Sequence, residues 1–107
     1  MTRLTIATAL SRLEGHDRRF IKLFEHGSLE VEMYAPRGTD PQKPHDRDEI
    51  YVVATGSGVF VRGDERQPVE PGEVLFVAAQ VEHRFVDFSD DFCTWVFFYG
   101  PVGGETP

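Results

Sequence analysis

The sequence has a single cysteine, Cys93, among its 107 residues. One cysteine excludes a disulfide framework within the chain and any zinc site built from several cysteines. Apolar runs are short, and none approaches the roughly 20 residues that a membrane-spanning helix needs. The apolar stretch near the N-terminus lacks a small-residue cleavage pattern, so we do not interpret it as a signal peptide. We therefore expect a cytoplasmic protein without a membrane segment.

Positive charge is also scarce, since 11 Lys and Arg stand against 18 Asp and Glu, a formal net charge of −7. Such a field repels phosphate backbones and anionic lipids, so neither nucleic acid nor membrane is an expected partner. A phosphate-binding glycine loop, a dinucleotide fingerprint and a serine nucleophile elbow are all absent. Cys93 lies within a strand pattern and is interpreted as a buried, inert thiol. These absences leave few of the common enzyme classes open.

The length suits one domain with a core that needs no disulfides. A short amphipathic helix is predicted near the N-terminus, with Thr5 as its N-cap and Gly15 as its stop. Its apolar residues recur with a helical period at Leu4, Ala7, Leu10 and Leu13. We predict an N-terminal helical segment over residues 1–15, a β domain over 16–100 and a flexible tail over 101–107.

Beyond Gly15, short runs rich in Phe, Val, Ile and Tyr alternate with Gly, Pro and Asp, which is typical of a small all-β barrel or sandwich. The expected strands cover residues 19–24, 29–35, 49–54, 59–62, 67–70, 73–78, 82–88 and 92–99. Nine Phe, three Tyr and one Trp predict an aromatic-rich interior. Both faces of the last strand are apolar. The pattern therefore leaves open whether Trp95 and Tyr99 or Val96 and Phe98 face inward.

Two of the four histidines have distinctive surroundings. His45 precedes Glu49 by four residues at the start of a strand pattern, and His83 follows Gly72 by eleven. The other two, His16 and His26, adjoin turn signals and are interpreted as surface residues. On a fully extended strand His45 and Glu49 would stand about 13 Å apart, whereas ligands of one metal approach within about 4 Å. A shared site therefore requires a bend within residues 46–48.

The segment from Gly38 to Gly56 resembles the first sequence motif of the cupin superfamily, a glycine, His-x-His, a glutamate and a closing glycine. His45, Glu49 and Gly56 match it, while Lys43 stands where the first histidine belongs and the first spacing is one residue short.

The second cupin motif is similar to the segment from Gly72 to Asp87. Gly72 and His83 match in register, and Ala78, Gln80 and Asp87 replace its Pro, Gly and Asn. The resemblance implies a double-stranded β-helix, also called a jelly-roll barrel, and a homodimer.

Metal-binding cupins resemble sites of three histidines and one glutamate, so the resemblance implies that His45, Glu49 and His83 are metal ligands. For the missing ligand, Gln42 is the nearest neutral oxygen donor, and Asp46 or Asp48 are carboxylate alternatives. Two imidazoles and a carboxylate suit one divalent transition metal such as Zn, Fe, Mn or Ni. Tyr51, which alternation from Glu49 points inward, is the candidate acid–base residue.

Three functions remain open. The leading hypothesis is a small-molecule metalloenzyme of the oxygenase or isomerase kind, with an unknown substrate. The alternatives are a binding module that holds a small ligand or senses metal, and a metal-free structural cupin. In the last case His83 would be an interior histidine bonded to a carbonyl, and Glu49 would pair with Arg47 or Lys43. The fold alone cannot choose among them.

Overall fold

The computed structural model of the protein describes residues 2–15 and 19–107, so the predicted surface position of His16 lies outside the described residues. His26 is exposed, as predicted. The elements in chain order are α1 (Ile6–Leu13), β1 (Phe20–His26), β2 (Leu29–Tyr34), β3 (Asp48–Thr55), β4 (Gly58–Arg62), β5 (Glu65–Val69), β6 (Val74–Val77), β7 (His83–Val86) and β8 (Cys93–Tyr99). Among the described residues, no helix is long and apolar enough to cross a membrane.

The N-terminal helix forms where its sequence signals place it. The Thr5 side chain accepts a hydrogen bond from the Thr8 backbone N–H at 3.1 Å, which satisfies one of the free donors of the first turn. The helix buries Ala9 and Leu13 against the sheet, while Ala7 is exposed. The predicted helix and cap are therefore confirmed, but its packed stripe excludes Ala7.

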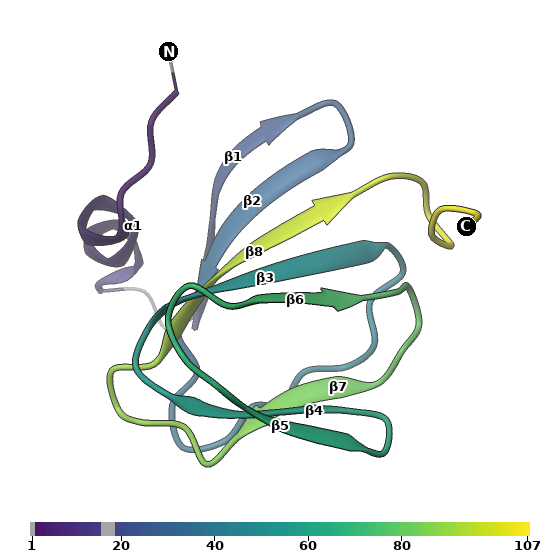
Figure 1. Ribbon diagram of the computed structural model, residues 1–107. Helices are drawn as coiled ribbons and strands as arrows, with labels where there is room; N and C mark the ends of the chain where they lie inside the picture. Colours follow the sequence, from purple (N-terminus) through teal and green to yellow (C-terminus); the bar gives the residue numbers. More distant parts are fainter. Residues whose placement is uncertain (1, 16–18) are drawn as a thin grey trace.

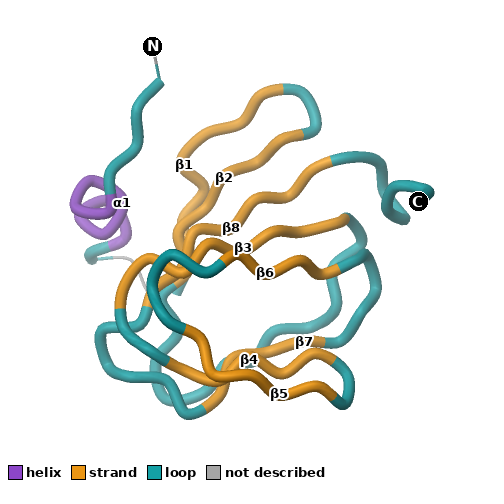
Figure 2. Tube along the Cα trace, in the orientation of Figure 1, coloured by secondary structure: helices purple, strands orange, loops and turns teal. Residues whose placement is uncertain are grey.

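Two antiparallel sheets face each other and form the barrel (Figures 1 and 2). The larger sheet has the strand order β1-β2-β8-β3-β6, and the smaller has the order β5-β4-β7. The last strand, β8, therefore lies between β2 and β3, which brings the two ends of the chain into one sheet. This is the all-β jelly-roll architecture that the sequence predicts.

Strand register decides which side chains fill the barrel. Tyr51 pairs with Val96 across β3 and β8, and both lie in the interior core together with Phe85. Tyr51 and Phe85 are completely buried, as alternation predicts. Trp95 lies on the outer side of β8, where it packs against the cluster beneath α1. Of the two apolar faces of β8, the one that carries Val96 therefore points into the barrel.

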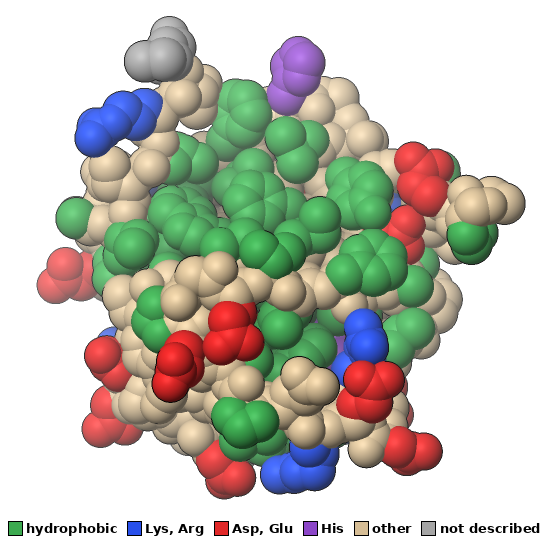
Figure 3. Space-filling model, in the orientation of Figure 1, with side chains coloured by type: hydrophobic (Ala, Val, Ile, Leu, Met, Phe, Trp, Pro, Cys, Tyr) green, Lys and Arg blue, Asp and Glu red, His purple; other side chains and the backbone are tan. Residues whose placement is uncertain are grey.

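The outer face of the five-stranded sheet is also apolar. Ile50 and Val52 of β3 stand opposite Phe76 and Val74 of β6 on this face, and Phe76 and Val74 are 46% and 66% exposed. Hydrophobic side chains gather over this sheet in the view of Figure 3. We call this surface, formed by Ile50, Val52, Val74 and Phe76, the outer apolar face.

The C-terminal residues contact the barrel near the start of β3. Gly103 donates its N–H to the Asp46 carbonyl at 2.6 Å, and Glu105 donates to Asp48 Oδ2 at 2.8 Å. Asp48 also accepts from the Ala79 N–H, and these two bonds, the Glu105 bond first, lower the pKa of its carboxyl. These bonds anchor part of the segment for which the sequence predicts a flexible tail, and its flexibility stays a prediction.

Candidate metal centre

Two side chains from the facing sheets and one from a loop converge at one end of the barrel. Glu49 lies near the start of β3 and faces inward between Val77 and Phe98, its register partners. His83 opens β7 on the opposite sheet. His45 lies in the loop before β3, and the chain bends at residues 46 and 47, as the spacing requires.

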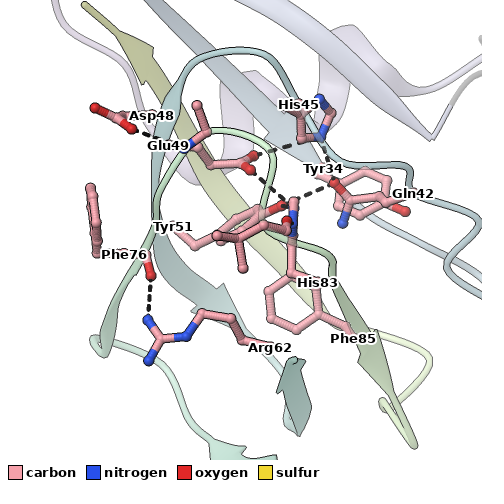
Figure 4. Close-up of polar contacts among 12 residues, drawn as sticks. Tyr34, Gln42, His45, Asp48, Glu49, Tyr51, Arg62, Phe76, His83 and Phe85 are labelled. Atoms are coloured by element: carbon pink, nitrogen blue, oxygen red, sulfur yellow. Dashed lines mark hydrogen bonds and ion pairs between the residues drawn. The ribbon is translucent and has the colours of Figure 1, made fainter. Parts of the chain in front are cut away.

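The ligand atoms of His45, Glu49 and His83 all lie within 4.8 Å of one another (Figure 4). Glu49 Oε1 is 3.0 Å from His83 Nε2, and Glu49 Oε2 is 3.9 Å from His45 Nε2. Bonds of about 2.0–2.2 Å to one metal place ligand atoms at separations of this size. Glu49 and His83 are almost fully buried, whereas 34% of the His45 side chain is exposed.

The Glu49 carboxylate is the unusual feature of this cluster. Both of its oxygens are buried, and neither has a hydrogen-bond partner among the residues that the structure describes. Leaving a buried charged acceptor unpaired costs more than the about 1–3 kcal/mol of a neutral group. The pairing of Glu49 with Arg47 that a structural role would need does not occur, because Arg47 contacts Glu30 and the Ser28 carbonyl instead.

The orientation of His83 shows what must lie between its ring and Glu49. Its Nδ1 lies 2.9 Å from the Val81 carbonyl, which can only accept, so Nδ1 carries the proton. In the neutral ring Nε2 then presents a lone pair toward Glu49 Oε1, and the two atoms are 3.0 Å apart. Two acceptors at this distance repel each other unless a proton or a metal ion lies between them. A backbone carbonyl that orients the second nitrogen is the usual support of a metal-binding histidine.

Burial and the neighbouring charges shift the two titratable groups around Glu49. Burial lowers the pKa of His83, but the contact with Glu49, the Val81 hydrogen bond and the negative charges of Glu49 and Asp40 outweigh it, so the net pKa is raised. Burial raises the pKa of the Tyr51 phenol well above its usual value, with the negative charge of Glu49 next in importance. Tyr51 therefore stays protonated near neutral pH and acts here as a hydrogen-bond donor.

Gln42 offers an additional oxygen atom beside His45. Its Oε1 lies 3.2 Å from His45 Nε2 and accepts from the Tyr51 hydroxyl at 3.0 Å. Of the carboxylate alternatives, Asp48 points away from the cluster to its backbone donors (Figure 4), and Asp46 is exposed. Lys43, at the position of the missing motif histidine, is also exposed. Two imidazole nitrogens, one carboxylate and one amide oxygen together form a donor set that fits a divalent transition metal.

A cavity of about 490 Å³ adjoins these residues. Its walls are largely apolar, with a small number of polar groups near the cluster, as in small-molecule sites. It is lined by Arg19, Phe20, Glu32, Tyr34, Pro41, Gln42, His45, Glu49, Val96 and Phe98. Trp95 and Tyr99 do not line it.

The sequence reasoning missed Glu32 as a cavity residue. Glu32 stands opposite Val96 on the interior face of β2 and lines the cavity. Burial raises the pKa of its carboxyl, and the negative charges of Glu30 and Glu49 add to the effect. The sequence signal for Glu32 is the alternation of residues 29–35, which distinguishes an apolar from a polar face of the strand. This alternation does not indicate that the polar face is the one that faces the cavity.

Comparison with known proteins decides the family. The family model of the cupin domain matches residues 30–99, which contain the two expected motifs. This chain belongs to the cupin family. At the second motif, Gln80 and Asp87 adopt positive φ values of 71° and 50° at the positions of the motif's glycine and asparagine. These are positions where the backbone adopts the left-handed region that glycine and asparagine enter most readily.

Relatives of this cupin include an uncharacterized protein of Streptomyces coelicolor, 34% identical over 88 residues, which cover 80% of this chain and 84% of that protein. The HTH-type transcriptional activator RhaS of Yersinia pestis is 35% identical over 71 residues, 66% of this chain but 26% of the activator. This cupin thus corresponds to about a quarter of the RhaS chain.

Solved structures share the fold at low identity. A cupin-2 domain protein from Shewanella frigidimarina superimposes with a TM-score of 0.70 and 17% identity, covering 92% of this cupin and 94% of that chain. A structure described as a DMSP lyase has a TM-score of 0.57 and 24% identity, covering 69% of this cupin and 38% of that chain. At these identities the likeness shows the fold alone.

Proposed function

We propose that this cupin binds one divalent transition metal through His45, Glu49, His83 and Gln42 and acts with it on a small molecule. The observation that carries the proposal is the fully buried Glu49 carboxylate, which lacks a hydrogen bond from any described residue and faces two histidine nitrogens. A cation among these atoms satisfies the carboxylate and the lone pair of His83 Nε2 together. If the cluster served packing only, we would expect an apolar residue at position 49, or a lysine that pairs with the Glu49 carboxylate.

A bound metal would supply Lewis acidity, which polarises a substrate carbonyl or activates water or oxygen. The Tyr51 hydroxyl stays protonated, donates its single hydrogen bond to Gln42 Oε1 and lies 2.9 Å from His83 Nε2. Phe20, Val96 and Phe98 provide apolar walls that accept the apolar body of a small molecule. Glu32 adds a carboxyl group on the cavity wall that can exchange a proton with a bound molecule. These features support an enzyme of the oxygenase or isomerase kind.

Metal analysis of untagged protein, purified without added metal, tests the metal site. We expect close to one transition metal per chain in the wild type and in His26→Ala, an exposed histidine far from the cluster in sequence. We expect a large loss in His83→Ala. Equal metal content in the two variants would remove His83 from the site, and a metal-free wild type that binds none on addition would favour a structural cupin.

A binding module is the second candidate, and the match to RhaS, a transcriptional activator, favours it. In that case the same metal and cavity would hold a small ligand without converting it. A panel of small carbonyl compounds and sugars, incubated with the metal-loaded protein and followed by mass spectrometry, separates the two. Product formation that disappears in Glu49→Gln supports an enzyme, whereas a ligand-induced rise in melting temperature without any product supports a binding module.

A further inference from the structure

Asp40 is a second buried carboxylate near the proposed centre, and it is fully hydrogen-bonded. It lies in the loop before His45 and is 7% exposed. Its Oδ1 accepts from the Tyr34 hydroxyl and from the Gln42 N–H at 3.2 Å. Its Oδ2 accepts from Gln42 Nε2 at 2.9 Å and from the Phe85 N–H at 2.8 Å. Asp40 thus joins β2, the loop and β7 through four donors.

The bond from Gln42 Nε2 decides which end of the Gln42 amide faces the cluster. An ionised carboxylate only accepts, so the amide must turn its NH₂ group toward Asp40. The carbonyl end, Oε1, is then directed at His45 Nε2 and the Tyr51 hydroxyl. An amide that was rotated by half a turn would present donors to the cluster, and a donor cannot bind a metal ion.

We propose that Asp40 is a positioning residue that fixes Gln42 as the oxygen ligand in place of the motif's missing histidine. The proposal rests on the metal site proposed above and adds a residue that does not itself contact the metal. Exchanging an imidazole for an amide oxygen makes the donor set harder, which favours Mn²⁺ relative to Zn²⁺. Asp40 therefore affects the choice of metal as well as the affinity.

A double-mutant cycle on metal affinity tests this role. Metal-free wild type, Asp40→Asn, Gln42→Met and the double variant are titrated with Mn²⁺ and with Zn²⁺ by calorimetry. The asparagine of Asp40→Asn keeps the shape of the side chain but offers one acceptor oxygen where four donors converge, so Gln42 loses its orientation. We expect each single variant to weaken Mn²⁺ binding about tenfold or more, as for other outer partners of metal ligands. The double variant should be no weaker than Gln42→Met, and the loss for Zn²⁺ should be smaller.

Tyr34→Phe is the matched control, because it removes another hydrogen bond of Asp40 and leaves the bond to Gln42 intact. It should lower the melting temperature while keeping the wild-type Mn²⁺ affinity and the wild-type ratio of the Mn²⁺ and Zn²⁺ affinities. Wild-type Mn²⁺ affinity in Asp40→Asn, or additive losses in the double variant, would overturn the positioning role although the metal site stands. A wild type that binds neither metal would overturn the proposed function itself.

Discussion

Replacing Glu49 by Gln should stabilise the metal-free cupin and abolish its response to metal. Glutamine has nearly the same shape but no charge, and its NH₂ group can donate to the His83 Nε2 lone pair, 3.0 Å from the present Oε1. The buried oxygens of Glu49 have no hydrogen bond from the described residues, so the substitution removes an unsatisfied charged group. The result would be a variant that folds better and functions worse.

The expected gain in stability follows from the cost of burying the Glu49 carboxylate without a hydrogen bond. Relieving an unsatisfied buried neutral group is worth about 1–3 kcal/mol, which is a lower bound for a charged one, and a domain of this size shifts its melting temperature by about 4–8 °C per kcal/mol. We therefore expect metal-free Glu49→Gln to melt about 5–20 °C above the metal-free wild type. Free metal at about 100 times its dissociation constant should stabilise the wild type by about 2.7 kcal/mol and the variant hardly at all.

Calorimetric melting at pH 8.5, with and without Mn²⁺, measures both effects. Glu32→Gln is the matched control, since it also neutralises a carboxylate of the cavity but lies outside the ligand set. It should keep the full metal-induced rise in melting temperature. A metal-free Glu49→Gln variant that melts below the wild type, or one that keeps the metal response, would refute the reasoning about Glu49.

Three further outcomes are expected. The raised pKa of His83 means that its bound proton stabilises the metal-free protein below about pH 6.5 and that this contribution is lost as the pH rises through the raised pKa. Metal competes with that proton, so the Mn²⁺-induced rise in melting temperature should be larger at pH 8 than at pH 6. An equal rise at both pH values would contradict the assignment of His83 as a metal ligand. The outer apolar face supports the expected homodimer, so Phe76→Asp should give a monomer by light scattering, whereas Val102→Asp, at an exposed position in the C-terminal segment, should not. Gly56 has φ +78° and a Cβ there would lie 2.6 Å from the Phe92 Cα, so Gly56→Ala should cost about 2 kcal/mol or more in urea unfolding. Gly27→Ala, at φ +59° with open space around it, should cost clearly less, and equal losses would contradict the packing argument.

Much of the fold could be predicted because its signals are local. Thr5 before an apolar period marks the helix start, and alternation from Glu49 and from His83 correctly places Tyr51 and Phe85 inside. The spacing of His45 and Glu49 also requires the bend that the chain makes. The metal roles of these residues stay predictions, although the structure brings their side chains together.

Other features depend on contacts that a linear pattern does not contain. Residues 29–34 alternate between apolar and polar side chains, but β2 turns Val31 and Met33 outward because Trp95 and Phe97 stand opposite them on β8 and α1 covers part of that face. Glu32 consequently faces the cavity. The same covering by α1 explains why Trp95, despite its size, lies outside the barrel.

Asp40 illustrates the same limit at the site. In the sequence it is one of several acidic residues in a proline-containing loop. Its importance appears only when Tyr34, Gln42 and the Phe85 backbone meet at its carboxylate. Phe85 is 45 residues away along the chain, so no local pattern reports this contact.

Anomalous diffraction from crystals grown with Mn²⁺ tests the central claim most directly. The account predicts one strong peak per chain, within bonding distance of a nitrogen of His45, a nitrogen of His83 and an oxygen of Glu49, with Gln42 Oε1 on the same ion. A Glu49→Gln crystal soaked in the same way should lack the peak. Manganese density found only on surface carboxylates, with the side chains of His45, Glu49 and His83 unchanged and empty space or a water molecule between them, would contradict the account.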